Sequence, residues 1–130
     1  MTDTNLSIKN TTKSRLTTSE ATFTAIKDVV LGKKYTLSIA FVGNRVSQNL
    51  NSKYRKKNTP TNILSFALTK NEGEIVMDLT KIRKETKLFD RSFNNLVLFL
   101  FIHGLFHLKG MEHGGTMENK EASVRKRFNI

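Results

Sequence analysis

The stretch that decides the fold is residues 92–108, SFNNLVLFLFIHGLFHL. Apolar residues fill most of it and predict a helix that is hydrophobic on nearly every face. Such a helix belongs at the centre of a fold, packed on several sides by other elements. Its longest uninterrupted apolar run, residues 96–102, has seven residues, whereas a membrane-spanning helix needs roughly 20.

The segments around this helix alternate between strand-like and helix-like patterns. Thr17 and Glu20 read as a capping box at the start of a helix that Gly32 ends. We predict strands at 5–9, 35–42, 62–68 and 74–79, and further helices at 46–54, 80–87 and 117–128. We therefore expect an α/β (α+β) fold: one small mixed sheet of about four strands, packed by helices, in a single domain over residues 1–130.

Composition narrows the class of protein. The chain has 130 residues and a net charge of +11, from 22 Lys and Arg against 11 Asp and Glu. This charge fits either nucleic-acid binding or a solvated surface kept for solubility. The absence of Cys excludes disulfides and thiolate metal sites. Residues 1–5 lack the layout of a signal peptide, so we expect a cytoplasmic protein that does not contact a membrane.

All three His of the chain fall within residues 103–113, HGLFHLKGMEH. His103 and His107 are four residues apart and project from one face of the predicted helix. Gly110 can end that helix and turn the chain, so that His113 returns to the same point. We predict that these three imidazoles bind one Zn²⁺ per chain and leave one coordination position open. Such a site lowers the pKa of bound water to about 7.

Another interpretation of the three His stays open. The His could be unrelated, two buried in a helix and one in a loop, but buried imidazoles need partners.

Gly104 lies inside the predicted helix, where Gly costs about 1 kcal/mol relative to Ala. It marks either a functional site or a place where another element packs closely, and these two readings are compatible.

The spacing H-x-x-x-H-x-x-G-x-x-H is that of metzincin proteases, which need Glu directly after the first His. Gly104 occupies that position here. The segment instead resembles H-G-x-L-H-L-x-G-Y-D-H of the YbeY family, with Phe106, Met111 and Glu112 replacing Leu, Tyr and Asp. Upstream, residues 50–55 (LNSKYR), 60–66 (PTNILSF) and 73–76 (GEIV) resemble the family's L-N-x-x-Y-R, P-T-D-V-L-S-F and G-D-I-x segments.

The resemblance implies a zinc-dependent, single-strand-specific endoribonuclease that acts in small-subunit ribosomal RNA maturation. It implies catalytic roles for Arg55 and His103, because a guanidinium can hold two oxygens of a phosphate on which negative charge develops. We place Arg55, Lys56 and Lys57 at the RNA, although the two lysines also fit a solvated loop. Glu112 is predicted to orient a ligand His, or else to lie on the surface.

The expected partners are single-stranded RNA, ribosomal RNA and, less directly, ribosomal proteins of the small subunit. Asn62 and Ser65 are expected at the sheet edge near the site, and residues 125–127 (RKR) fit either RNA contact or solvation. Four side chains are expected in the core rather than as surfaces on which bases stack: Phe99, Phe101, Leu105 and Phe106. Two other functions stay open, namely a non-catalytic assembly factor with structural zinc and a metalloprotease.

Overall fold

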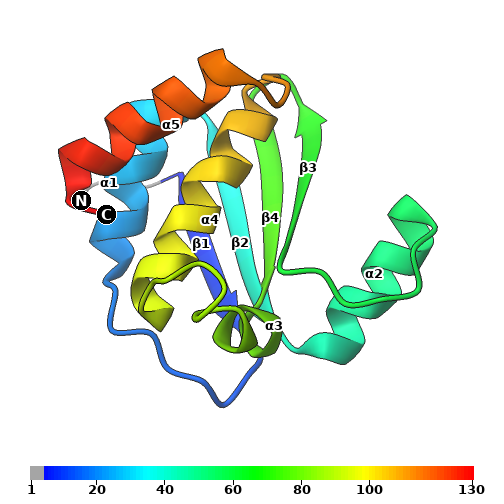
Figure 1. Ribbon diagram of the computed structural model, residues 1–130. Helices are drawn as coiled ribbons and strands as arrows, with labels where there is room; N and C mark the ends of the chain where they lie inside the picture. Colours follow the sequence, from blue (N-terminus) through cyan, green and yellow to red (C-terminus); the bar gives the residue numbers. More distant parts are fainter. Residues whose placement is uncertain (1–4) are drawn as a thin grey trace.

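The computed structural model describes residues 5–130, so most of the N-terminal stretch in which we expect no signal peptide lies outside the described residues. The elements follow in the order β1 (Leu6–Asn10), α1 (Glu20–Leu31), β2 (Thr36–Val42), α2 (Asn44–Arg55), β3 (Ile63–Thr69), β4 (Glu72–Asp78), α3 (Leu79–Lys84), α4 (Phe93–Leu108) and α5 (Gly115–Phe128). Figure 1 shows their arrangement.

The four strands form one mixed sheet in the order β1-β2-β4-β3. The pairs β1/β2 and β2/β4 are parallel, and β3 runs antiparallel to β4. The antiparallel pair is joined by a tight turn at residues 70–71, and β4 begins at Glu72, two residues before the predicted strand. The parallel pairs need longer crossovers. The predicted fold class is confirmed: it is a mixed α/β fold with a four-stranded mixed sheet.

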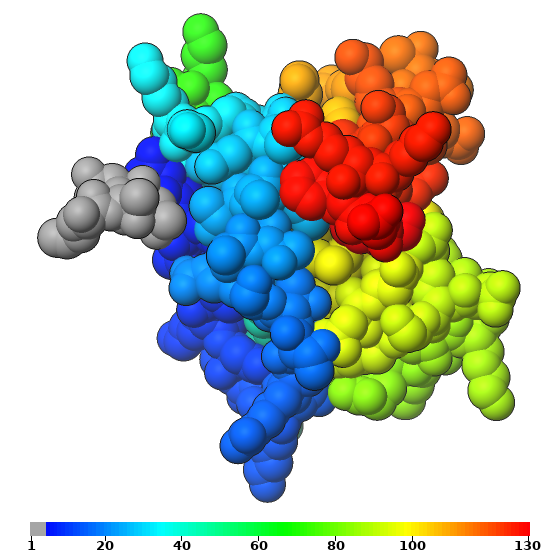
Figure 2. Space-filling model, turned by 90° about the vertical axis from the view of Figure 1, so that its left-hand side faces the viewer, coloured from blue at the N-terminus to red at the C-terminus, as the bar shows by residue number. Residues whose placement is uncertain are grey.

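The main core lies between one face of the sheet and helices α1, α3, α4 and α5 (Figure 1). Alternate residues of β2, Leu37, Ile39 and Phe41, point into it because side chains alternate across a strand. Helix α4 contributes residues from all around its circumference, as its apolar sequence predicts. Figure 2 shows α1 and α5 side by side on the surface, with α4 visible beside them.

The opposite face of the sheet is covered at one end by α2. A small second core joins Leu50 of α2 to Val42, Leu64 and Val76 of the strands. Asp78, the fully buried last residue of β4, accepts hydrogen bonds from Ser47 Oγ of α2 at 2.6 Å and from the Lys81 amide of α3 at 2.9 Å. This buried carboxylate therefore fixes the position of α2 against the sheet.

The cap of helix α1 differs from the prediction. The cap of α1 is Ser19, whose side chain accepts from the Thr22 amide, so the capping box predicted at Thr17 is wrong. The Thr17 amide instead bonds to the Asn94 side chain. This contact with a residue of α4 holds Thr17 outside helix α1. Within residues 5–130, every helix is too short or too polar to cross a membrane.

Candidate metal centre and its cavity

Helix α4 places His103 and His107 on one face, next to strand β3. The helix packs so closely on that strand that a Cβ added at Gly104 would lie 2.8 Å from Ile63 Cδ1 and 3.0 Å from Ser65 Oγ. Gly104 therefore serves as the close-packing residue that was one of its two predicted roles. A Glu at this position, where a metzincin protease carries one after its first His, would require the side chains of Ile63 and Ser65 to move.

Gly110 brings the third His back to the helix. The Met111 amide bonds to Phe106 O at 3.1 Å and the Gly110 amide to His107 O at 2.9 Å, which is the Schellman pattern. Gly110 takes a φ of 92°, in the region that favours glycine. The chain reverses directly after α4, so that His113 lies beside the two helix His, as predicted.

The three imidazoles are close enough to share one ion. His103 Nε2 lies 3.0 Å from His107 Nε2, and one nitrogen from each of the three His lies within 4.8 Å of the others. Zinc–nitrogen bonds of about 2.0–2.1 Å at a tetrahedral angle place two ligand nitrogens about 3.3 Å apart. The donor set and its spacing therefore fit a divalent metal ion such as zinc.

A buried carboxylate fixes the orientation of the first imidazole. Glu121 Oε1 lies 2.9 Å from His103 Nδ1, and Glu121 is 6% exposed. An Nδ1–H donated to this carboxylate leaves the lone pair on Nε2, which points toward the other two His. This contact sets the tautomer that a metal ligand requires.

The electrostatic surroundings favour a neutral second imidazole. Burial lowers the pKa of His107, and the nearby His103, His113 and Arg55 lower it further, while Glu121 raises it. A lowered pKa keeps the imidazole unprotonated at neutral pH, which is the form that binds metal.

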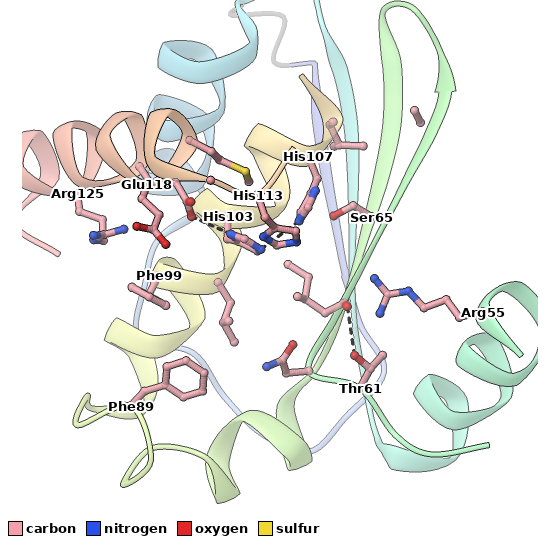
Figure 3. Close-up of a pocket in the computed structure, with 18 residues that line it drawn as sticks. Arg55, Thr61, Ser65, Phe89, Phe99, His103, His107, His113, Glu118 and Arg125 are labelled. Atoms are coloured by element: carbon pink, nitrogen blue, oxygen red, sulfur yellow. Dashed lines mark hydrogen bonds and ion pairs between the residues drawn. The ribbon is translucent and has the colours of Figure 1, made fainter. Parts of the chain in front are cut away.

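The three His open into a cavity of about 810 Å³. One wall comes from β3 through Ile63, Ser65 and Ala67, and the others come from α4 and α5. Arg55, at the end of α2, is exposed and points into this cavity (Figure 3). The cavity thus joins a potential metal site to an exposed guanidinium, with solvent access to both.

The predicted site residues divide into two groups. Arg55, Asn62, Ser65 and the three His line the cavity. Lys56, Lys57 and Glu112 are exposed and do not line it. Within residues 5–130, the carboxylate that contacts a site imidazole belongs to Glu121. The role of Glu121 could have been found from the sequence. Met117, Glu121 and Val124 are spaced so that they share one buried face of α5, and a buried carboxylate needs a hydrogen-bonding or charged partner.

The four side chains expected in the core also divide into two groups. Phe101, Leu105 and Phe106 are buried in the core. Phe99 packs against that core but is only half-buried, and it lines the cavity together with Phe89 and Arg125. Of the basic residues at 125–127, only Arg125 reaches the cavity.

Comparison with known proteins agrees with this geometry. The model of the family described as "Endoribonuclease YbeY" matches residues 2–129. Relatives of that name include one from Carboxydothermus hydrogenoformans, 39% identical over 63% of this chain and 61% of its own length. Another from Mycoplasmopsis synoviae is 36% identical over 70% of this chain and 65% of its own length.

A third relative, from Neorickettsia sennetsu, is 30% identical over 80% of each chain. The chain thus spans less than two thirds of the length of the first two relatives and four fifths of the third. The solution structure of TM1509 from Thermotoga maritima has the same fold, with a TM-score of 0.60 at 20% identity over 94% of this chain and 91% of that one. The family match and the three-His cluster lead to one conclusion: this chain belongs to the endoribonuclease YbeY family.

Proposed function

We propose that this protein is a zinc-dependent endoribonuclease that cleaves single-stranded RNA during maturation of the small-subunit ribosomal RNA. The observation that carries the proposal is the convergence of His103, His107 and His113 in a cavity that also receives Arg55. The relatives' name, endoribonuclease, supports RNA as the substrate. With ribosomal RNA as substrate, the protein would act in the cytoplasm, next to ribosomal proteins of the small subunit.

Each residue of the site has a definite task in this proposal. His103, His107 and His113 hold the metal, and Glu121 orients His103. The ion, when bound, supplies a Lewis acid that polarises a phosphoryl oxygen and lowers the pKa of coordinated water. Arg55 contacts the non-bridging oxygens of the scissile phosphate and stabilises the negative charge that develops on them.

The donor set favours catalysis over a structural role for zinc. Structural zinc sites have four protein ligands, whereas catalytic sites have three and an open position. The described residues offer three His at this point, and the nearby Glu121 is already bonded to His103 Nδ1. A non-catalytic assembly factor with closed zinc would need a fourth ligand here.

One comparison of substrates tests the proposal. The zinc-loaded protein is incubated with a single-stranded RNA, the matching duplex and an unfolded polypeptide. We expect cleavage of the single strand alone. Peptide hydrolysis without RNA cleavage would favour the protease, and salt-sensitive RNA binding without any cleavage would favour the assembly factor.

A further inference from the structure

The cavity continues from the three His to an aromatic arm, formed by Phe89, Phe99 and Arg125 (Figure 3). Phe99 precedes His103 by four residues on the same face of α4, a distance of about 6 Å along the helix. Arg125 follows Glu121 by four residues on α5. Two contacts one helical turn apart therefore join α5 to α4. Glu121 contacts His103, and Arg125 contacts Phe99.

The aromatic arm combines ring surface with positive charge. The Phe89 and Phe99 ring centroids lie 5.8 Å apart and the rings are tilted by 56°. The guanidinium carbon of Arg125 lies 5.0 Å from the Phe99 centroid and that of Arg91 lies 4.1 Å from it. The two guanidinium groups concentrate positive charge at the Phe99 ring, with Arg125 lining the cavity and Arg91 just outside it. Burial lowers the pKa of Arg91, and the nearby charge of Arg125 lowers it further. Glu118, which also lines the cavity, offsets part of the positive charge.

We propose that the aromatic arm binds the nucleobase of a nucleotide next to the scissile phosphate, while Arg125 contacts a backbone phosphate of the same strand. This inference rests on the proposed function. Nucleobases stack on aromatic side chains and on guanidinium planes, and phosphates pair with arginine. The arm lies one helical turn from His103, a distance comparable to that between a nucleotide's base and its phosphate.

A base subsite inside the cavity gives a physical reason for single-strand specificity. A base can stack on Phe99 only after it has left its own stack and its pairing partner, which is costly in a duplex and cheap in a single strand. Stacking is tolerant of sequence because every base has an aromatic face. The arm should therefore accept any of the four bases, with a preference set by stacking strength.

The first test compares two phenylalanines of the same helix. Phe99→Leu removes the ring from the cavity, and Phe93→Leu is the matched control because Phe93 is half-buried, contacts Arg83 through its ring and does not line the cavity. Single-turnover cleavage of one labelled RNA is followed over a range of protein concentrations. Phe99→Leu should raise the half-saturating protein concentration by roughly tenfold, and Phe93→Leu should leave it near the wild-type value.

The second test changes the RNA, and its first measurement is made on the wild-type protein. The base is removed from each nucleotide in turn on both sides of the cleaved bond. One abasic position should weaken wild-type binding by roughly tenfold, and at that position Phe99→Leu should cause no additional loss. Equal effects of Phe99→Leu and Phe93→Leu, or independent effects of the variant and of every abasic position, would overturn the inference.

The charge of the arm is tested with two arginines of one helix. Arg125→Gln should reduce the slope of log affinity against log salt by about 0.7, the contribution of one phosphate on a single strand. Arg127→Gln is the control, since Arg127 is exposed on α5 and lies outside the cavity. Equal slope changes in both variants would remove Arg125 from the subsite.

The two hypotheses fail separately in these experiments. If wild-type protein cleaves no RNA, the proposed function fails, and fluorescence anisotropy of the same labelled RNAs then measures the subsite directly. If wild-type protein cleaves single-stranded RNA and the Phe99 and Phe93 variants behave alike, the proposed function stands and the base subsite is wrong.

Discussion

Glu121 Oε1 lies 2.9 Å from His103 Nδ1 and joins α5 to the metal-site face of α4. The carboxylate is buried, so its partner imidazole is held in one orientation. The C-terminal helix is thereby part of the site, although it supplies no metal ligand within the three-His cluster.

Removal of this carboxylate should weaken metal binding. Glu121→Ala frees the His103 ring to rotate and to change tautomer, and we expect zinc affinity to fall by roughly 10- to 100-fold. Glu112→Ala is the matched control, because Glu112 is close to His113 in sequence but exposed and outside the cavity. Competition with a chelating dye measures both. A larger loss of zinc affinity in Glu112→Ala than in Glu121→Ala would contradict this assignment. Glu112, as predicted from the sequence, would then be the residue that orients a ligand His.

Replacement of Gly110 by a residue with a side chain should lower the free energy of unfolding. Gly110→Ala forces a φ of 92° on a residue with a Cβ, and we expect a loss of unfolding free energy of about 1–2 kcal/mol. Gly115→Ala is the control. Gly115 is the first residue of helix α5, and a Cβ added there would meet no neighbouring side chain or strand within 4 Å. This substitution should be neutral or stabilising. Urea unfolding measures both variants, and equal effects would contradict this account of the turn.

Arg55 should be required for RNA cleavage and dispensable for metal binding. Arg55→Ala removes the guanidinium that points into the cavity, and we expect the rate to fall by roughly 100-fold. Arg45→Ala is the control, since Arg45 is an exposed arginine of the same helix and lies outside the cavity, and its rate should stay within a fewfold of wild type. Zinc content should match wild type in both. Unchanged turnover in Arg55→Ala would remove this residue from the site.

Much of this site is readable from local sequence. The i, i+4 spacing of His103 and His107 depends only on helix geometry, and the Gly110 turn on one residue's backbone freedom. The contacts of Glu121, Phe99 and Arg125 depend instead on how α5 crosses α4, which is a tertiary property. Periodicity marked Phe99 as core because α4 is apolar on every face, and nothing local shows which face borders a cavity.

The N-cap of α1 also could not be predicted from the local sequence alone. Thr17, Thr18 and Ser19 are three successive hydroxyl residues, and each is a good N-cap. Ser19 is the cap in the structure, whereas the Thr17 amide bonds to the Asn94 side chain of α4. The position of the cap thus accompanies a tertiary contact with α4 that the capping motif alone does not show.

In the proposed mechanism, one metal ion held by His103, His107 and His113 supports RNA cleavage. The most direct measurement follows the rate of single-strand cleavage as chelator-treated protein is titrated with zinc, with bound zinc measured in the same samples. The rate should rise in proportion to occupancy up to about one zinc per chain, and the triple His→Ala variant should bind none and cleave nothing. Full cleavage by the metal-free protein, or full zinc occupancy in the triple variant, would contradict the account.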